Sequence, residues 1–446
     1  MIRRMLFCLI SSVAATSFVA LGGEAEGLIV HEWGVWVRTT TDHGTLWSSP
    51  EELVKQLPPF VRLLEKEYKP SRQDIGWQKP VIHMYGPDGL AVSVKIATPQ
   101  GHPTAYFPPA ALDQKTILVQ DFGVPMSYSL TDCFGLQWNG TLSARPQGKL
   151  PEVDPAHWWA GVRQVPSAYF HSKDNEERFL FYEATAFQEP VVVGDVTAEE
   201  LTLKLELPRG GKRTVSTGAV ARIQPVLAIL NDGSNRWFWS ANSLTADSPA
   251  RLKKTDLLRH PATDREILDA AQSQWESYGM TKEEAAAIVE VWKPDLLGTL
   301  GFLVISRMPT PLYEQMFPLT VTPKPTAIVR AGVVFDTLPG TKDRLRWLPE
   351  LRKLFEQWGQ ELGNENPVAR AAAAAKLARQ GDLVRPVLED LVRRNTGALK
   401  SEAEKLLALL KPQKADGPLL PTSTPTEWIR SSGANAFGGG QSSVHP

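Results

Sequence analysis

Cysteine is almost absent from this sequence. Among 446 residues only Cys8 and Cys133 occur, and Cys8 lies in an N-terminal segment that we expect to be removed. One remaining cysteine excludes an internal disulfide, so the stability of the fold must come from a sizeable hydrophobic core. For Cys133 the sequence favours a buried, inert thiol over a nucleophile.

The motifs of several enzyme classes are also missing. The sequence has no Gly-x-Ser-x-Gly elbow, no phosphate-binding glycine loop and no dinucleotide-binding fingerprint. Its eight histidines lack the His-x-His and His-Glu-x-x-His spacings that are typical of metal sites. We therefore predict no metal and no cofactor, and interpret the histidines as hydrogen-bonded core residues.

Neither charge nor hydropathy indicates a nucleic-acid or membrane partner. The formal net charge is −1, which provides no attractive field for nucleic acid. The apolar stretch Met5–Leu21 follows Arg3 and Arg4 and ends at small residues, as export signals do. We predict cleavage after Gly22, no transmembrane segment after that cleavage, and export to the periplasm, the cell envelope or the medium.

What the sequence does contain is a series of short strands between turns. The 35 prolines and 33 glycines favour turns over a long helical bundle. Residues 28–38 are apolar, β-branched and aromatic, which predicts an inner strand of a β framework. Residues 90–98 and 102–107 alternate around a turn and predict a hairpin, as do the strands on either side of residues 231–234.

Helical periodicity occurs in two later regions. Apolar residues at helical spacing from about 263 to 292 predict an αα-hairpin that covers one sheet face and is stopped by Pro294. Thr281 with Glu284 forms a capping box, which predicts the start of the second helix. The sequence thus predicts an α+β protein with a mainly antiparallel, sandwich-like β body and an inserted αα-hairpin. Its predicted divisions are a signal peptide (1–22), the β body (23–340), a helical module (341–412) and a disordered tail (413–446).

Two glutamates inside apolar strands are the candidate catalytic residues. Glu32 lies in the first strand, and Glu183 follows Tyr182 in a later one. A buried carboxyl group has a raised pKa, which suits a general acid, and glycosidases use pairs of carboxyl groups. The same pattern is typical of a structural glutamate that is bonded to a buried arginine or a backbone amide, and this second interpretation is favoured.

The candidate binding residues are histidines and aromatic residues. Side chains alternate along a strand, so His31 shares a face with Trp33, and His83 shares one with Tyr85. Residues 157–159 form an aromatic patch that could stack on a sugar, although tryptophan packs more often in a core. The complete set is His31, Trp33, His83, Tyr85, His157, Trp158 and Trp159.

Four segments of the sequence are distinctive in combination: His31-Glu32-Trp33-Gly34, Pro80–Tyr85, Phe179–Tyr182, and the αα-hairpin with Trp292 and the strand that follows it. Together they resemble a family of exported bacterial proteins that has no assigned activity. The resemblance spans residues 28–336, and it implies export and a shared fold but no catalytic residue. This chain has Val35-Trp36 where the family usually has Thr-Phe. Separately, the C-terminal helices resemble a fragment of a HEAT-like α-solenoid.

Two functions are compatible with these features. The leading hypothesis is an exported binding or interaction protein, because the sequence combines an export signal, many aromatic residues and a solenoid-like module without a catalytic motif. Its expected partner is a protein or a polysaccharide. The alternative is a secreted hydrolase, directed at glycosides, that uses Glu32 and Glu183.

Overall fold

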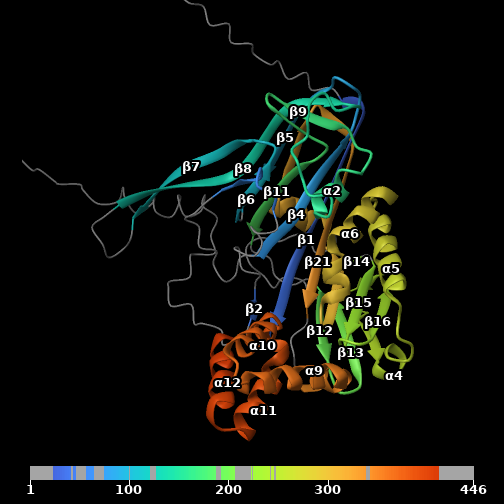
Figure 1. Ribbon diagram of the computed structural model, residues 1–446. Helices are drawn as coiled ribbons and strands as arrows, with labels where there is room; N and C mark the ends of the chain where they lie inside the picture. The colour runs from blue at the N-terminus through green and yellow to red at the C-terminus, as the bar shows by residue number, and fades with distance from the viewer. Residues whose placement is uncertain are drawn as a thin grey trace, which may run out of the picture.

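The protein is built around a ten-stranded sheet. The computed structural model describes residues 24–41, 44–46, 57–64, 75–99, 101–120, 127–186, 192–205, 222–223, 225–241, 243–245, 248–337 and 342–410. The sheet has the order β16-β15-β19-β21-β1-β4-β11-β6-β3, with β2 paired to β1 (Figure 1). Its strands are β1 (Glu24–Thr41), β2 (Gly44–Leu46), β3 (Arg62–Leu63), β4 (Ile75–Tyr85), β6 (Gly101–Phe107), β11 (Leu180–Ala186), β15 (Val226–Asn231), β16 (Arg236–Ala241), β19 (Gly301–Arg307) and β21 (Lys324–Thr337).

Strand β1 is an inner strand of this sheet, as its sequence predicts. It pairs in parallel with β21 and antiparallel with β4, so that Trp33 lies between Ala331 and Val81. The β-branched and aromatic residues of β1 fit a strand that is covered on both faces. The two other strands are far away in sequence, so the position of β1 depends on long-range contacts rather than on hairpins.

A second, six-stranded sheet has the order β10-β9-β8-β5-β20, with β7 paired to β8. The predicted hairpin of residues 90–98 and 102–107 is wrong, because β5 pairs with β8 and β20 while β6 pairs with β11 and β3. Alternation identified both strands, but it does not specify a partner. The strands are β5 (Ala91–Ala97), β7 (Ala111–Gln120), β8 (Ser127–Ser143), β9 (Tyr169–Ser172), β10 (Asn175–Glu177) and β20 (Leu319–Thr322).

The two faces of the large sheet have separate cores. On one face Val30 and Trp36 of β1 pack in a cluster with Trp138 and Phe170 of the six-stranded sheet. Further along, this same cluster includes a three-stranded sheet of β12 (Val192–Val196), β13 (Glu200–Leu205) and β18 (Ala250–Lys253), and the C-terminal helices. On the other face Trp33 packs with residues of the helices α2 (Trp158–Val162), α5 (Asp264–Ser277) and α6 (Lys282–Gly298). The molecule is therefore layered, with α2, α5 and α6 on one face of the large sheet and the two smaller sheets and the C-terminal helices on the other.

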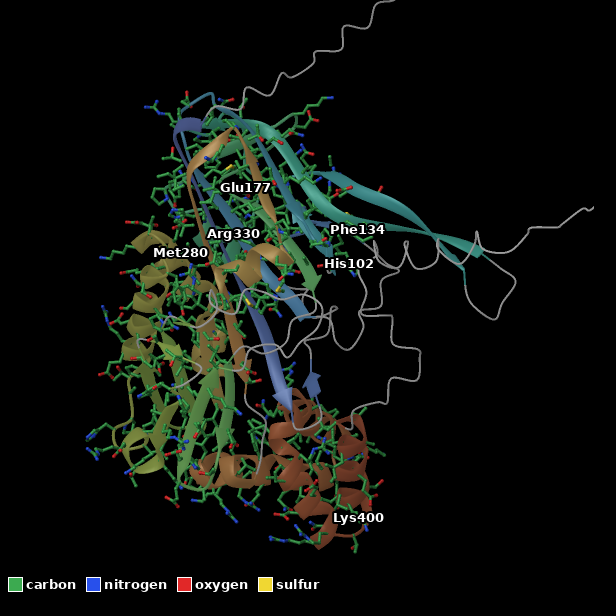
Figure 2. All side chains as sticks on the ribbon, turned by 180° about the vertical axis from the view of Figure 1, so that it is seen from behind. His102, Phe134, Glu177, Met280, Arg330 and Lys400 are labelled. Atoms are coloured by element: carbon green, nitrogen blue, oxygen red, sulfur yellow. The ribbon has the colours of Figure 1, made fainter. Side chains whose placement is uncertain are left out.

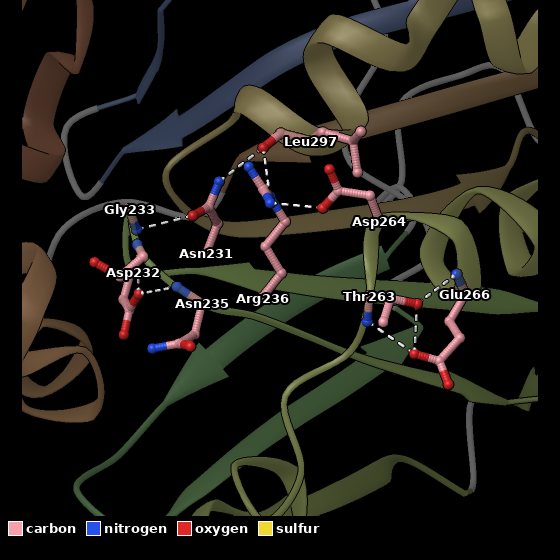
Figure 3. A network of polar contacts seen from close by, with 10 residues as sticks. Asn231, Asp232, Gly233, Asn235, Arg236, Thr263, Asp264, Glu266 and Leu297 are labelled. Atoms are coloured by element: carbon pink, nitrogen blue, oxygen red, sulfur yellow. Dashed lines mark hydrogen bonds and ion pairs between the residues drawn. The ribbon is translucent and has the colours of Figure 1, made fainter.

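Helices α5 and α6 form the predicted αα-hairpin, and both begin with a capping box. Helix α6 continues through Pro294 to Gly298, so the expected stop at Pro294 is wrong. Its last turn is held by the adjacent β15–β16 hairpin. Arg236 Nε and Asn231 Nδ2 donate to the Leu297 carbonyl at 2.7 and 3.0 Å (Figure 3). These bonds satisfy a carbonyl that the helix end leaves without an intrahelical partner.

The C-terminal helices form a compact module at the end of the large sheet opposite β9 (Figure 1). Figure 2 shows Lys400 in this module and Glu177 at the far end of the body. Trp347 anchors the module, because its indole Nε1 donates to the Thr197 carbonyl at 2.8 Å. The helices are α8 (Lys342–Trp347), α9 (Pro349–Gln360), α10 (Pro367–Arg379), α11 (Arg385–Arg394) and α12 (Gly397–Leu410).

The remaining short elements are β14 (Arg222–Ile223), β17 (Leu244–Thr245), α4 (Lys254–Leu257) and α7 (Thr310–Met316). Cys133 is buried, and its thiol lies 3.3 Å from the Gly135 carbonyl oxygen. Within the described ranges, no helix combines the length and the apolar character needed to cross a membrane. The predicted signal peptide and the predicted tail lie outside the described residues.

Replacing Trp33 by alanine should destabilise the protein by about 3 to 5 kcal/mol, as large-to-small substitutions in cores do. Trp33 is 1% exposed and lies at the centre of the helix-covered core. Urea denaturation measures the change. Val368→Ala, at a side chain that is 75% exposed, is the control and should change the free energy of unfolding by less than about 0.5 kcal/mol. Equal effects of the two substitutions would contradict an inner position of Trp33.

Candidate functional site between the large sheet and helices α2 and α6

Two of the predicted binding residues, His31 and His83, lie directly opposite each other on β1 and β4. They project toward α6, on the sheet face that carries Trp33. The His31 Nδ1 lies 2.8 Å from Glu284 Oε2, and both side chains are almost fully buried. The same Glu284 oxygen accepts the backbone N–H of Thr281 at 2.8 Å, as part of the capping box of α6. One carboxylate therefore caps the helix and attaches it to the sheet.

Burial and neighbouring charges shift the pKa values of several groups around this histidine pair. Complete burial lowers the pKa of His83 to about 4, and its Nδ1 lies 3.0 Å from Ser167 Oγ. Burial alone would raise the pKa of Glu284, but the hydrogen bond from His31 and the nearby imidazoles hold that pKa below its usual value. Burial, together with the Glu284 charge, raises the pKa of Tyr85, whose ring lies 5.2 Å from that of His31. His83 Nε2 and Glu284 Oε1 have no hydrogen-bond partner among the described residues.

A second polar cluster surrounds Lys79, four residues before His83 on β4. The Lys79 Nζ lies 4.6 Å from the ring centroid of Trp292 in α6 and 5.6 Å from that of Trp158 in α2. The Lys79 backbone has a φ of 50°, a left-handed conformation that residues other than glycine rarely adopt. The indole Nε1 of Trp292 has no hydrogen-bond partner among the residues that the structure describes.

Two carboxyl groups face this lysine. Burial raises the pKa of Glu183 to about 7, against the opposing effects of the backbone N–H and the ammonium group of Lys79. Burial also raises the pKa of Asp295, and the positive charge of Lys79 again acts to lower it. The pKa of Lys79 is lowered by burial, although Asp295 and Glu183 both act to raise it. Lys79 and Glu183 are buried, whereas Asp295 and Trp158 are partly exposed, so the cluster reaches the surface.

Helix α6 connects the two clusters because the distance between Glu284 and Asp295 along it is close to the distance between His83 and Lys79 along β4. Glu284 and Asp295 are separated by about 16 Å of helix at 1.5 Å per residue. Lys79 and His83 are separated by about 13 Å of strand at 3.3 Å per residue. One end of α6 therefore lies over the histidine pair while its other end lies over Lys79.

The aromatic patch at residues 157–159 lies beside the Lys79 cluster, and its three members differ. His157 caps α2, since its Nδ1 accepts the Trp159 backbone N–H at 3.1 Å. Trp159 is a core residue that is 0% exposed, and its Nε1 donates to Glu177 Oε2 at 2.8 Å. Trp158 is partly exposed, and its ring centroid lies 5.4 Å from that of His157. Of the three, Trp158 has the indole surface that a ligand could reach.

Glu32 lies on the opposite face of the large sheet. It accepts hydrogen bonds at 2.5 Å from Arg330 Nε and from the Tyr182 hydroxyl, and it is 0% exposed. Arg330, its register partner on β21, also donates to the Phe317 carbonyl at 2.7 Å. Glu183 shares its face with Phe179 and Phe181, in the core that α2 and α6 cover. The structure therefore does not bring Glu32 and Glu183 together.

Four residues of these networks were missed at the level of sequence. Lys79 and Arg330 are single cations within strand-like runs, which is the signal that could have marked them. The sequence marked Glu284 only as one member of a capping box. Nothing in the sequence marked Asp295, because an acidic residue directly after Pro294 is typical of an exposed position. In the part of the chain that the structure describes, no group of three or more His, Cys, Asp and Glu side chains is arranged to hold a metal ion.

Comparisons with known proteins give no match: no family model, no curated protein and no solved structure is similar to this chain.

The buried His83 should make the protein less stable in acid. Its pKa is about 4 in the folded protein and 6.5 when unfolded, so only the unfolded chain binds a proton between these values. The free energy of unfolding should therefore fall as the pH decreases from 6.5 to 4, by about 3 kcal/mol from this group. Urea denaturation across this pH range measures the slope. His83→Gln should flatten it and exposed His260→Gln should not, and equal slopes in all three proteins would refute the assignment.

Removing one partner of the Glu32–Arg330 pair should lower the free energy of unfolding. Arg330→Met leaves the Glu32 carboxylate buried without its cation, which should destabilise the protein by about 3 to 5 kcal/mol. The double variant Glu32→Gln/Arg330→Met removes both charges and should recover part of that loss in urea denaturation. The control, Arg352→Met, removes a half-exposed arginine 2.6 Å from Asp390 and should cost about 1 kcal/mol or less. No recovery in the double variant would argue against a buried charge pair.

Proposed function

We propose that this chain is an exported binding protein whose ligand is a neutral polysaccharide. The signal-like N-terminus supports export, and the C-terminal helices are proposed to be a HEAT-like fragment that completes the core. The observation that carries the proposal is the convergence of Lys79, Glu183 and Asp295 beside the partly exposed indole of Trp158.

The chemistry of this cluster matches a sugar better than it matches an ion. A pyranose ring has an apolar C–H face that stacks on an indole, and hydroxyl groups that both donate and accept hydrogen bonds. The ammonium group of Lys79 is a donor and the carboxyl group of Asp295, which is partly exposed, is an acceptor, while Glu183 and Trp292 are buried against them. The opposite charges offset one another, so neither a strongly acidic nor a strongly basic polymer is favoured.

A hydrolase remains the second candidate because of one observation. The pKa of Glu183 is about 7, so near neutral pH this carboxyl group is protonated in a large part of the molecules, as a general acid must be. The other carboxyl group near Lys79 belongs to Asp295, not to Glu32. A catalytic pair in this protein would therefore consist of Glu183 and Asp295.

Binding can be tested with the full exported chain and two defined glucans. Affinity electrophoresis in gels that contain laminarin or hydroxyethylcellulose should retard the wild-type protein. Trp158→Ala should weaken the retardation at least about 10-fold, which corresponds to about 1.4 kcal/mol of lost stacking. The matched control is Trp358→Ala, because Trp358 is also a partly buried tryptophan with a lysine near its ring, at 5.8 Å from Lys376 Nζ, but lies in the helical module.

The same samples separate binding from hydrolysis. New reducing ends that form with the wild-type protein and disappear in Glu183→Gln, but persist in Glu32→Gln, would assign hydrolysis to the Lys79 cluster. Retardation without new reducing ends supports a binding protein. No retardation by either glucan, or equal retardation of wild type and Trp158→Ala, would refute the polysaccharide proposal. Thermal melts of each variant establish that it is folded.

A further inference from the structure

A serine, a histidine and a glutamate form a chain of contacts on the six-stranded sheet, outside both clusters. Ser143 ends β8, His171 lies in β9 and Glu176 lies in β10. The Ser143 Oγ lies 2.5 Å from His171 Nε2, and His171 Nδ1 lies 3.6 Å from Glu176 Oε2. These are the atoms through which a nucleophile, its base and an orienting carboxylate contact one another in serine hydrolases.

The register of the strands produces this arrangement. Leu142 pairs with Phe170, and both side chains point into the core between the sheets. Their neighbours Ser143 and His171 therefore point to the outer face. Glu176 lies directly opposite His171 on the next strand, which places its carboxylate on that same face. Three separate strands thus present the three side chains to one region.

The Glu176 carboxylate is fixed independently of the histidine. Its oxygens accept the backbone N–H groups of Gln147 and Gly148 at 3.0 and 2.6 Å. Both donors belong to the exposed loop of residues 144–150, which follows Ser143 and covers the three side chains. The loop approaches so closely that a Cβ atom on Gly148 would lie 3.2 Å from the carboxylate. The orienting group is therefore held in place before any ligand is bound.

The Ser143 hydroxyl has two acceptors within reach. Besides His171 Nε2, the Arg145 carbonyl lies 2.6 Å from Oγ. A hydroxyl group has one proton, so the reactive rotamer is the one that points this proton at His171. The backbone N–H of Ala144 donates to Asp88 Oδ1 at 2.9 Å, which leaves this amide unable to stabilise an oxyanion in the present arrangement. Ser143 is 2% exposed, so the exposed loop of residues 144–150 would have to move before an ester could reach Oγ, and a small acyl group requires the least movement.

We propose that Ser143, His171 and Glu176 form a second site in this protein, a serine esterase centre for esters of small carboxylic acids. The proposal is independent of the sugar-binding cluster, because none of the three residues belongs to that cluster. Its substrate class is an ester of an alcohol with a short acyl chain, such as an acetyl ester.

The reaction balances with water as the only co-reactant. Ser143 Oγ attacks the ester carbonyl carbon while His171 Nε2 takes the hydroxyl proton. The C–O bond to the alcohol then breaks, and His171 returns the proton to the departing oxygen. Water next attacks the acyl-serine and gives a proton to His171, which passes it to Ser143 Oγ as the acid leaves. Glu176 acts as a positioning residue that stabilises the imidazolium form of His171.

Covalent labelling and turnover of the full chain test this proposal. Diisopropyl fluorophosphate should add one phosphoryl group, located at Ser143 by peptide mass spectrometry. Hydrolysis of p-nitrophenyl acetate should exceed that of p-nitrophenyl octanoate, and should fall at least about 100-fold in Ser143→Ala and in His171→Gln. Ser172→Ala is the matched control, because this adjacent serine donates to the Asn175 carbonyl at 3.3 Å and should leave labelling and turnover unchanged.

Steady-state kinetics separate positioning from a purely structural role of Glu176. Glu176→Gln removes the charge that faces the developing imidazolium in the transition state, so kcat for p-nitrophenyl acetate should fall at least about 10-fold while KM changes little. A folded wild-type protein that is neither labelled nor active overturns the proposal. Labelling or turnover that survives Ser143→Ala at wild-type levels overturns it as well. Changes confined to melting temperature would identify the three residues as a latch for the loop, with no catalytic role.

Discussion

Both faces of β1 are covered along residues 30–36, so the polar side chains of this segment, His31 and Glu32, must find their partners inside the protein. Alternation sends His31 to the helix-covered face and Glu32 to the face that carries Tyr182, Arg330 and Phe317. Each residue meets a charge that comes from a distant segment, Glu284 for His31 and Arg330 for Glu32. Since an unpaired buried charge costs several kcal/mol, these pairings fix which segments can lie against β1. The layered architecture follows from this requirement.

Helix α6 transmits this constraint to the rest of the helix-covered face. Its first turn is attached to His31 by Glu284, and its last turn is held by Arg236 and Asn231 of the β15–β16 hairpin (Figure 3). A helix fixed at both ends has little freedom to slide. The Lys79 cluster lies beneath the second half of this helix. The contacts at the two ends of α6 therefore position Trp292 and Asp295, although neither residue takes part in those contacts.

Local patterns in the sequence specified strands and helices but not their partners. The alternation around Trp33 was sufficient to predict an inner strand with His31 and Glu32 on opposite faces, and the capping box at Thr281 marked the start of α6. The same reasoning paired residues 90–98 with 102–107 incorrectly, because the chain passes from the six-stranded sheet to the ten-stranded sheet in the short turn between these two strands. Lys79 could not be assigned to a site, since its aromatic and acidic neighbours come from three segments that only the tertiary fold brings together.

The Glu32 and Lys79 networks contain the same kinds of groups, a cation, carboxyl groups and aromatic rings, yet they differ in how directly the cation is bonded to a carboxyl group. Arg330 bonds Glu32 directly at 2.5 Å, and both are sealed from water, as expected of a structural pair. Around Lys79 the backbone is in a rare conformation, and the pKa values of Glu183 and Asp295 are raised by burial. Stability alone would favour apolar side chains at such a place. A cluster that is held in this state beside a partly exposed indole therefore supports the binding role that we propose for it.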